Sequence, residues 1–187
     1  MERVGDRLLS ALWVGFAAAS LGTWQRTGCP LYLGWLTLNL VTAVLFWIRR
    51  SPRRLAPLGP AWGWAIVGTS LPFGLSAPAR MTGPAWILAV SGVALALWGL
   101  VSLGRSFGVV AADRGRRIGG AYRFLAHPIY LGEVGMFTGV AIASPIPRNL
   151  AILTALACVQ WMRAREEAGF HGNPVRFRWK DLVSTQV

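Results

Sequence analysis

The chain has 187 residues, of which 54% are hydrophobic and only 14% charged, and it carries a net charge of +12. Soluble domains carry about 25% charged residues, so this composition excludes an ordinary soluble domain and predicts an integral membrane protein. The basic residues are spread over the connections between apolar segments, so we expect no nucleic-acid partner.

Six apolar segments recur along the chain, each close to the roughly 17–25 residues that cross a bilayer as a helix. With a cytoplasmic N-terminus, sixteen of the nineteen Lys and Arg residues fall on the cytoplasmic side, where such residues are enriched. Only an even number of crossings gives this partition. The sequence therefore predicts an all-α, polytopic transmembrane helical bundle in the cytoplasmic (inner) membrane, with both termini inside. Its segments are 8–24, 31–48, 60–77, 84–103, 128–144 and 149–163.

Residues 1–103 hold the first four segments, and we expect them to form a scaffold that lines the site without taking part in the chemistry. The third segment contains Pro72, which we expect to kink its helix. The fourth segment has Gly92 and Gly99 on one face, seven residues apart. Small residues of this kind allow transmembrane helices to approach closely.

The two cysteines are expected to stay unpaired, because they lie at different depths of the predicted topology. Cys29 falls in an outer turn, and Cys158 lies inside the last segment. We therefore expect a free outer thiol at Cys29 and a buried one at Cys158.

The character of the chain changes at residue 104. Residues 104–127 form an inner connection rich in glycine and arginine, and connections longer than about 12–15 residues are uncommon and usually functional or disordered. Segments 128–144 and 149–163 follow, joined by a tight turn. We therefore predict a C-terminal catalytic region over residues 104–187, built around an antiparallel helical hairpin.

Polar residues gather where the fifth segment begins, in the stretch GAYRFLAHPIYLGE at 120–133. His127 precedes Pro128, and proline is favoured in the first turn of a helix. The N-terminus of that helix suits an anionic group. Tyr130 and Glu133 follow at intervals of three, although an ionised side chain costs about 2.5–3.5 kcal/mol inside a membrane. The alternative interpretations are an interfacial histidine bound to headgroups or water, and an inner-loop arginine paired with Glu133.

Glu166 and Glu167 lie just beyond the last segment, where ordinary ion pairs at a solvated helix end would also explain them. In an antiparallel hairpin, however, the start of the fifth segment and the end of the sixth meet at the same membrane boundary. His127 and Tyr130 would then face Arg163, Glu166 and Glu167 beneath the inner connection. This arrangement predicts one pocket that holds most of the polar chemistry of the chain.

Three motifs occur in this order: LGRSFGV, GAYRFLAHPIYLGE and RAREE. Together they resemble the isoprenylcysteine carboxyl methyltransferase family and its bacterial relatives, with phospholipid N-methyltransferases as more distant kin. The resemblance covers about residues 100–172 and implies a membrane-embedded enzyme that uses S-adenosyl-L-methionine. Ala126 stands where that family usually has an arginine. The family's HPxY motif, its tyrosine-arginine step and its paired glutamates correspond to His127, Pro128, Tyr130, Tyr122, Arg123, Glu166 and Glu167.

The resemblance implies that the cofactor binds at the cytoplasmic ends of the last two helices. In this assignment the helix start and His127 hold the carboxylate of S-adenosyl-L-methionine. Glu166 binds the ribose hydroxyls, and the ring of Tyr130 faces the cationic sulfonium. The full set of cofactor-binding residues is His127, Pro128, Tyr130, Tyr122, Glu166 and Glu167.

The acceptor decides which residues are needed for catalysis. Methyl transfer is a direct displacement, so positioning and the exclusion of water dominate. A carboxylate acceptor, such as the prenylated cysteine of the family, needs no base, and Arg163 or Arg123 would orient it. An amine or a hydroxyl needs a base, for which Glu133 is the candidate.

Two other functions stay open. Membrane sterol reductases have a related C-terminal half, and a lipid or sterol-type reductase using NADPH would bind phosphate through Arg114, Arg116 and Arg117. A non-catalytic transporter or adaptor would bind neither cofactor. The chain has no CxxC, HExxH or histidine cluster, so we predict no metal site. The expected partners are membrane lipids and a lipophilic acceptor that comes laterally from the bilayer, and the oligomeric state has no signal in the sequence.

Overall fold

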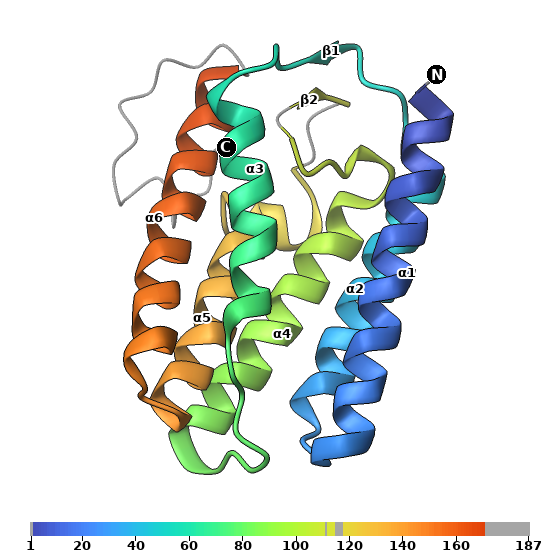
Figure 1. Cartoon of the computed structure of the whole chain (residues 1–187). Coiled ribbons are helices and arrows are strands. Elements are labelled where there is room, and N and C mark those ends of the chain that lie inside the picture. The colour runs from blue at the N-terminus through green and yellow to red at the C-terminus, as the bar shows by residue number, and fades with distance from the viewer. Residues whose placement is uncertain (1, 111, 115–117, 171–187) are drawn as a thin grey trace.

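The computed structural model describes residues 2–110, 112–114 and 118–170. Within these residues, helices dominate and strands are limited to two short pieces, so the predicted all-α bundle is confirmed (Figure 1). The α-helices are α1 (Glu2–Thr27), α2 (Leu31–Ile48), α3 (Pro60–Ser70), α4 (Gly83–Leu103), α5 (Pro128–Ala143) and α6 (Pro147–Phe170). Shorter elements are the 3₁₀ turns η1 (Leu71–Gly74), η2 (Gly104–Ser106) and η3 (Gly120–Arg123), and the strands β1 (Arg54–Leu55) and β2 (Ala112–Asp113).

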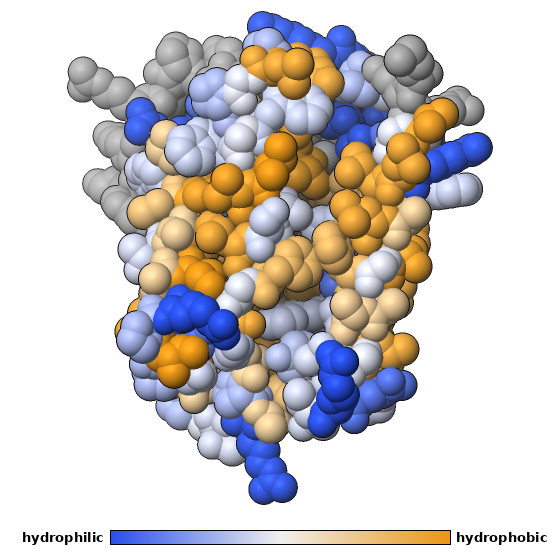
Figure 2. All heavy atoms as spheres, viewed as in Figure 1, coloured by the Kyte–Doolittle hydropathy of each residue, from blue (hydrophilic) through white to orange (hydrophobic). Residues whose placement is uncertain are grey.

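Three stretches of helix are long and apolar enough to cross a membrane by length and composition. They are Val4–Thr27 in α1, Leu31–Ile48 in α2, and Gly83–Ser106 in α4 with the turn that follows it. Pro128–Ala143, the helix α5, is a shorter apolar helix. Figure 2 shows hydrophobic side chains along both α3 and α1 on the face that is drawn. These helices indicate a membrane protein, whereas six complete crossings remain a prediction.

One end of the bundle, which we call the basic end, carries both long connections. There lie residues 49–59, the described part of 104–127 and the last turns of α6 (Figure 1). Arg26, Arg80 and Arg148 lie toward the opposite end, in the last turn of α1, just before α4 and at the start of α6. Among the described residues, the fold therefore separates the basic residues as the predicted topology requires, and the side of a membrane that each end faces remains a prediction.

The third predicted segment, 60–77, is not one kinked helix. Its α-helix, α3, ends at Ser70, and the 3₁₀ turn η1 follows directly. Pro72 has no N–H to donate to the helix, and its ring clashes with the carbonyl four residues earlier. The prediction of a kink is therefore wrong, because the proline ends the α-helix instead of bending it.

Helices α4 and α5 approach each other through glycines. A Cβ atom added to Gly92 or to Gly132 would lie within 3.0 Å of the backbone of the facing helix. Gly99 lies in the same way against Ile129 and Pro128, the first residues of α5. The predicted role of the small residues of α4 is confirmed, and it determines where α5 begins relative to α4.

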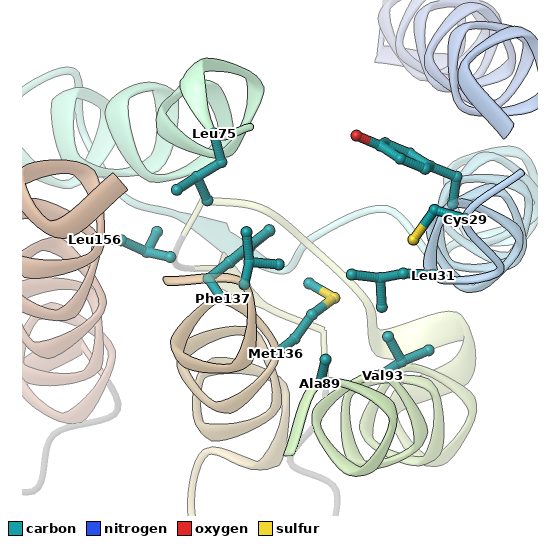
Figure 3. Packing of buried hydrophobic residues seen from close by; sticks show 10 residues of the cluster. Cys29, Leu31, Leu75, Ala89, Val93, Met136, Phe137 and Leu156 are labelled. Atoms are coloured by element: carbon teal, nitrogen blue, oxygen red, sulfur yellow. The ribbon is translucent and has the colours of Figure 1, made fainter. Parts of the chain in front are cut away.

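The main hydrophobic core is shared by α2, α4, α5 and α6 (Figure 3). Met136 and Phe137 of α5 belong to it together with Val93 of α4. Trp35 of α2 donates its indole N–H to the Sδ atom of Met136 at 2.9 Å. The two predicted regions, which meet between residues 103 and 104, therefore pack around one core, and their division by function remains a prediction.

Cys29 and Cys158 are both free, but their exposure is the reverse of the prediction. Cys29 is 0% exposed, because the turn after α1 packs it into the main core beside Leu31 (Figure 3). Cys158 is exposed on the outer face of α6. The position of a residue along the chain gives its depth in the bundle but not the side of the element on which it lies.

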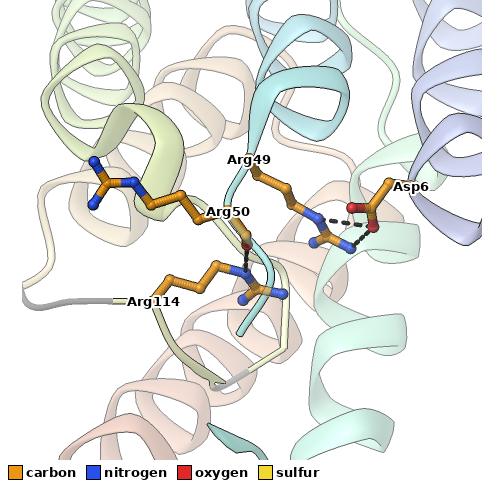
Figure 4. Close-up of polar contacts among 4 residues, drawn as sticks. All are labelled: Asp6, Arg49, Arg50 and Arg114. Carbon is orange, nitrogen blue, oxygen red and sulfur yellow. Dashed lines mark hydrogen bonds and ion pairs between the residues drawn. The ribbon is translucent and has the colours of Figure 1, made fainter. Parts of the chain in front are cut away.

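At the basic end, the strands β1 and β2 pair antiparallel and join the connection after α2 to the connection after α4. Arg114 follows β2 and is buried, and its Nε–H donates to the carbonyl oxygen of Arg50 at 3.1 Å (Figure 4). Nearby, Arg49 forms an ion pair with Asp6 of α1. We call the paired strands and the Arg114 bond the clasp, and it holds the segment before β2 close to the bundle.

Candidate functional site

The candidate site lies where α5 begins and α6 ends, at the basic end. Pro128 occupies the first turn of α5, and His127 precedes it as the N-cap residue without a side-chain hydrogen bond to the helix. Gly99 of α4 packs against this first turn. The N-terminus of α5 therefore lies where the sequence predicts it, and the side chain of its N-cap residue does not cap it.

Glu167 of α6 links the two helices. The hydroxyl of Tyr130 donates a hydrogen bond to Oε1 of Glu167, and Nδ1 of His127 lies 3.4 Å from Oε2 of the same carboxylate. The rings of His127 and Tyr130 stack, with their centroids 5.5 Å apart and an angle of 10° between their planes. The predicted meeting of the first turn of α5 with the end of α6 is confirmed.

Arg163 lies at the centre of this cluster, and it is only 9% exposed. Its Cζ atom is 4.7 Å from the centroid of the Tyr130 ring. Its Nη1 and Nη2 atoms donate to Oε1 of Gln160 and to the carbonyl oxygen of Val109, both at 3.0 Å. Val109 belongs to the connection after α4, so the described part of that connection reaches the site, and its covering of the whole site remains a prediction. On the other side, a Cβ added to Gly68 of α3 would lie 3.3 Å from the Arg163 side chain.

Glu133 lies one turn deeper in α5 and has its partners on α6. The side chain of Gln160 donates from Nε2 to Oε2 of Glu133. The guanidinium that acts electrostatically on Glu133 is that of Arg163. Among the described residues, the charged partner of Glu133 is therefore on α6 and not in the inner connection, and the acid joins the same cluster as Tyr130 and Glu167.

Two groups outside the predicted crossings have shifted pKa values: Glu167 of the cluster and Tyr122 of η3. Burial raises the pKa of Tyr122, and the negative charge of Glu167 adds to this effect. For Glu167, burial alone would raise the pKa, but hydrogen bonds from His127 and Tyr130 and the charge of Arg163 outweigh it and lower the pKa. Glu167 is therefore a carboxylate at neutral pH, whereas the phenol of Tyr122 keeps its proton.

The remaining predicted residues are less central. Glu166 is half-buried, and within the described ranges it makes no hydrogen bond or ion pair. Arg123 is exposed in η3, where its Cζ atom lies 5.9 Å from the centroid of the Phe124 ring. The structure thus brings together His127, Tyr130, Glu133, Arg163 and Glu167, and it leaves Arg123 at the surface.

Sequence reasoning misses three residues of the cluster: Gln160, Val109 and Gly68. Gln160 precedes Arg163 by three residues and Glu167 by seven, which is the spacing of one helix face, and this pattern could have found it. Val109 contributes only its backbone carbonyl, so its side chain gives no signal. Gly68 matters because its lack of a side chain leaves room for Arg163. This role can be recognised only when α3 is known to pack against α6.

A family model of phospholipid methyltransferases matches residues 81–171, a segment that contains α4, α5 and α6. Neither a curated protein nor a solved structure is significantly similar to the chain. The match supports a membrane methyltransferase, of the superfamily that includes both phospholipid and isoprenylcysteine carboxyl methyltransferases. The match agrees with the resemblance seen in the motifs at the level of this superfamily, and it does not select the isoprenylcysteine branch.

Proposed function

We propose that this protein transfers a methyl group from S-adenosyl-L-methionine to a lipophilic acceptor that arrives from the bilayer. The observation that carries the proposal is the convergence of His127, Tyr130, Arg163 and Glu167 at the junction of α5 and α6. This junction lies inside the segment that matches phospholipid methyltransferases. Methyltransferases of that kind generally use S-adenosyl-L-methionine, which when bound supplies an electrophilic methyl group on a sulfonium.

The described residues fit the groups of this cofactor. The N-terminus of α5, to which its N-cap residue His127 makes no side-chain hydrogen bond, suits the cofactor carboxylate. Glu166 is half-buried and without a polar contact in the described part of the chain, so it offers a carboxylate to the ribose hydroxyls. The ring of Tyr130 already faces the Arg163 guanidinium, so we do not assign it to the sulfonium. Instead, its hydroxyl orients Glu167.

The charges around Arg163 favour an amine or hydroxyl acceptor over a carboxylate. The guanidinium already donates to Gln160 and Val109 and interacts with Glu133 and Glu167. Two carboxylates beside one guanidinium repel an anionic acceptor. In this proposal the lone pair of the acceptor forms the bond to the methyl carbon while the carbon–sulfur bond breaks, and Glu133 takes the proton that the acceptor releases.

A prenylated-cysteine carboxylate, which the motif resemblance implies, is the second candidate acceptor. Arg123 favours it, because an exposed guanidinium in η3, five residues before Pro128 at the start of α5, is free of the two buried glutamates. Such an acceptor has no proton to lose. Its methylation would therefore not depend on Glu133.

Calorimetry of the detergent-solubilised protein with S-adenosylhomocysteine and with NADPH tests the proposed cofactor. We expect S-adenosylhomocysteine to bind and NADPH not to bind. Binding of NADPH alone would point to a lipid or sterol-type reductase, and binding of neither to a transporter or adaptor, so either result overturns the proposal. Transfer of labelled methyl to a total membrane lipid extract then identifies the acceptor class by separation of the labelled products.

A further inference from the structure

Trp64 of α3 carries a buried polar atom without a partner. Its indole Nε1 is enclosed by the protein and has no hydrogen-bond acceptor among the described residues. Buried donors in proteins are nearly always hydrogen-bonded, and an unpaired one costs about 1–3 kcal/mol. The indole of Trp62 in the same helix follows this rule, since it donates to the carbonyl oxygen of Ala56 at 3.1 Å. The N–H of Trp64 is therefore an exception, which a hydrogen-bond acceptor on a bound ligand would explain.

Trp64 lies one helical turn from a residue that touches the candidate site. The buried residues of α3 are Ala65 and Gly68, and a Cβ added to Gly68 would lie 3.0 Å from Val159 and 3.3 Å from Arg163. Helix α3 runs away from the basic end, and α6 runs toward it (Figure 1). Trp64 is therefore nearer to the basic end than Gly68, at the level of the last turns of α6.

The same turns of α3 also face the outside of the bundle. Ile66 is 63% exposed and Val67 is 42% exposed, and nothing lies within 4 Å of a Cβ added to Gly63. Ile66 and Val67 are thus exposed apolar side chains of α3, and Figure 2 shows hydrophobic side chains along this helix. A molecule with a hydrocarbon chain can lie along this surface and bring its polar part to the level of Trp64.

We propose that Trp64 is a specificity-determining residue, whose indole N–H donates a hydrogen bond to an oxygen atom of the lipophilic acceptor. The oxygen is a carbonyl or phosphoryl oxygen at the junction between the polar and the hydrocarbon part. This inference rests on the proposed methyl transfer to such an acceptor. An indole has a large apolar face and a single donor, which suits a site where one side is apolar and the other polar. When this oxygen binds, the indole N–H gains a hydrogen-bond partner and its free-energy cost is removed. A methyl acceptor that carries such an oxygen therefore binds more tightly than one that lacks it.

The unpaired state of the donor is tested in the ligand-free protein. Benzothienylalanine has the shape of tryptophan with sulfur in place of N–H, and it can replace Trp64 or, as the matched control, Trp62. We expect the thermal midpoint to fall for the change at Trp62, which loses the bond to Ala56, and to stay or rise for the change at Trp64. An equal fall at both positions would mean that the Trp64 N–H has a partner inside the protein, and the proposal would be wrong.

Binding is tested by thermal-shift titration with 1-palmitoyl lysophosphatidylethanolamine and with its 1-O-alkyl ether. For Trp64→Phe and for the benzothienylalanine variant, we expect half-maximal stabilisation at a concentration about 3- to 10-fold higher, which is the loss of one neutral hydrogen bond. Affinity for S-adenosylhomocysteine should change less than about twofold, because the cofactor lies on α5 and α6.

The ether probe distinguishes the two kinds of oxygen. If the wild type prefers the ester and the variants lose this preference, the partner is the ester carbonyl. If the variants weaken both probes equally, the partner is a phosphoryl oxygen. Unchanged affinity of the variants for both probes, or no binding of either probe to the wild type, overturns the proposal. Failure of the proposed methyltransferase function gives a different result, namely no binding of S-adenosylhomocysteine to the wild type.

Discussion

Helix α5 presents two faces of opposite character. Toward α4 it has Gly132 and Gly139, where an added Cβ would meet the backbone of α4. Toward α6 it has Tyr130 and Glu133, whose side chains bond to Glu167 and Gln160. The first face leaves no space for any group, and the second gathers groups that are costly to bury. The difference indicates a division of roles in α5. Backbone contact with α4 determines the position of the helix, so the side that faces α6 can hold polar and ionisable groups.

The largest effect is expected on the glycine face. Gly132→Ala places a methyl group against the amide nitrogen of Ala96, and we expect it to lower the free energy of unfolding by at least about 3 kcal/mol. Reversible unfolding in detergent or mixed micelles measures this. The matched control is Gly15→Ala in α1, where nothing lies within 4 Å, and alanine there should be neutral or slightly stabilising. Equal stability of the two variants would contradict the close approach of α4 and α5.

The next effect concerns chemistry on the opposite face. Glu133→Gln removes a buried charge but keeps the shape of the side chain, so we expect the thermal midpoint to stay or rise. Methyl transfer to an amine or hydroxyl should fall by about a hundredfold, which is the usual contribution of a general base. The rate of methyl transfer, measured with bound cofactor in excess, checks this. Full activity of the variant would favour the carboxylate acceptor and remove Glu133 from the mechanism.

Glu167 and its neighbour Glu166 should differ in their effects on stability, although both should affect cofactor binding. Glu167→Gln weakens the interactions with His127 and Tyr130, so both the thermal midpoint and the affinity for S-adenosylhomocysteine should fall. The loss of a charge-assisted hydrogen bond, about 1.5–3 kcal/mol, corresponds to roughly one to two decades in dissociation constant. Calorimetry and thermal unfolding of the same sample measure the two quantities.

Glu166→Gln is the matched control for that experiment. Because Glu166 makes no polar contact with the described residues, we expect its thermal midpoint to be unchanged. Affinity for S-adenosylhomocysteine should still fall by about tenfold, as one hydrogen bond to a ribose hydroxyl is weakened. If Glu166→Gln binds the ligand normally, the ribose is held by another group, and our placement of the cofactor changes.

The smallest effect is expected from Arg114, which holds the connection that contacts the candidate site. Arg114→Gln removes the Nε–H bond to the Arg50 carbonyl and loosens the clasp, which leads to Val109, an acceptor of Arg163. We expect a loss of about 1 kcal/mol in stability and about a threefold loss of affinity for S-adenosylhomocysteine. Arg105→Gln is the control, because Arg105 is exposed and its side chain donates to the carbonyl oxygen of Ile48, at the end of α2, at 3.1 Å. Equal affinity losses would show that the clasp acts on the site no more than any neighbouring arginine does.

The position of the candidate site could be predicted from the sequence, because the start of α5 and the turn after it are set by residues with known backbone preferences. Pro128 can start a helix but cannot continue one, so it sets the beginning of α5. A short turn then requires the end of α6 to return to the same end of the bundle. The meeting of His127 and Tyr130 with Arg163 and Glu167 follows from these two facts, and the structure has it.

The partners of individual groups could not be predicted, because they depend on how each helix is rotated about its axis. A helix that is apolar nearly all round, such as the middle of α6, gives no periodic signal that sets this rotation. The spacing of Gln160 from Arg163 and Glu167 indicates a shared face of α6, but it does not show that this face meets Glu133, and no pattern places Cys158 on the outer face. The end of α3 before Pro72 was missed for a different reason, since a membrane-spanning helix can tolerate proline with a kink or end at it.

Glu133 finds its bonded partner on the helix that follows it in synthesis. When α5 leaves the ribosome, Gln160 and Arg163 have not yet been made, and an unpartnered acid costs about 2.5–3.5 kcal/mol in the bilayer. The connection from Ser144 to Pro147 is short, so α6 follows at once. We therefore expect α5 and α6 to enter the bilayer together as a hairpin, and a nascent chain halted before Gln160 should hold α5 less firmly in the membrane than the complete chain does.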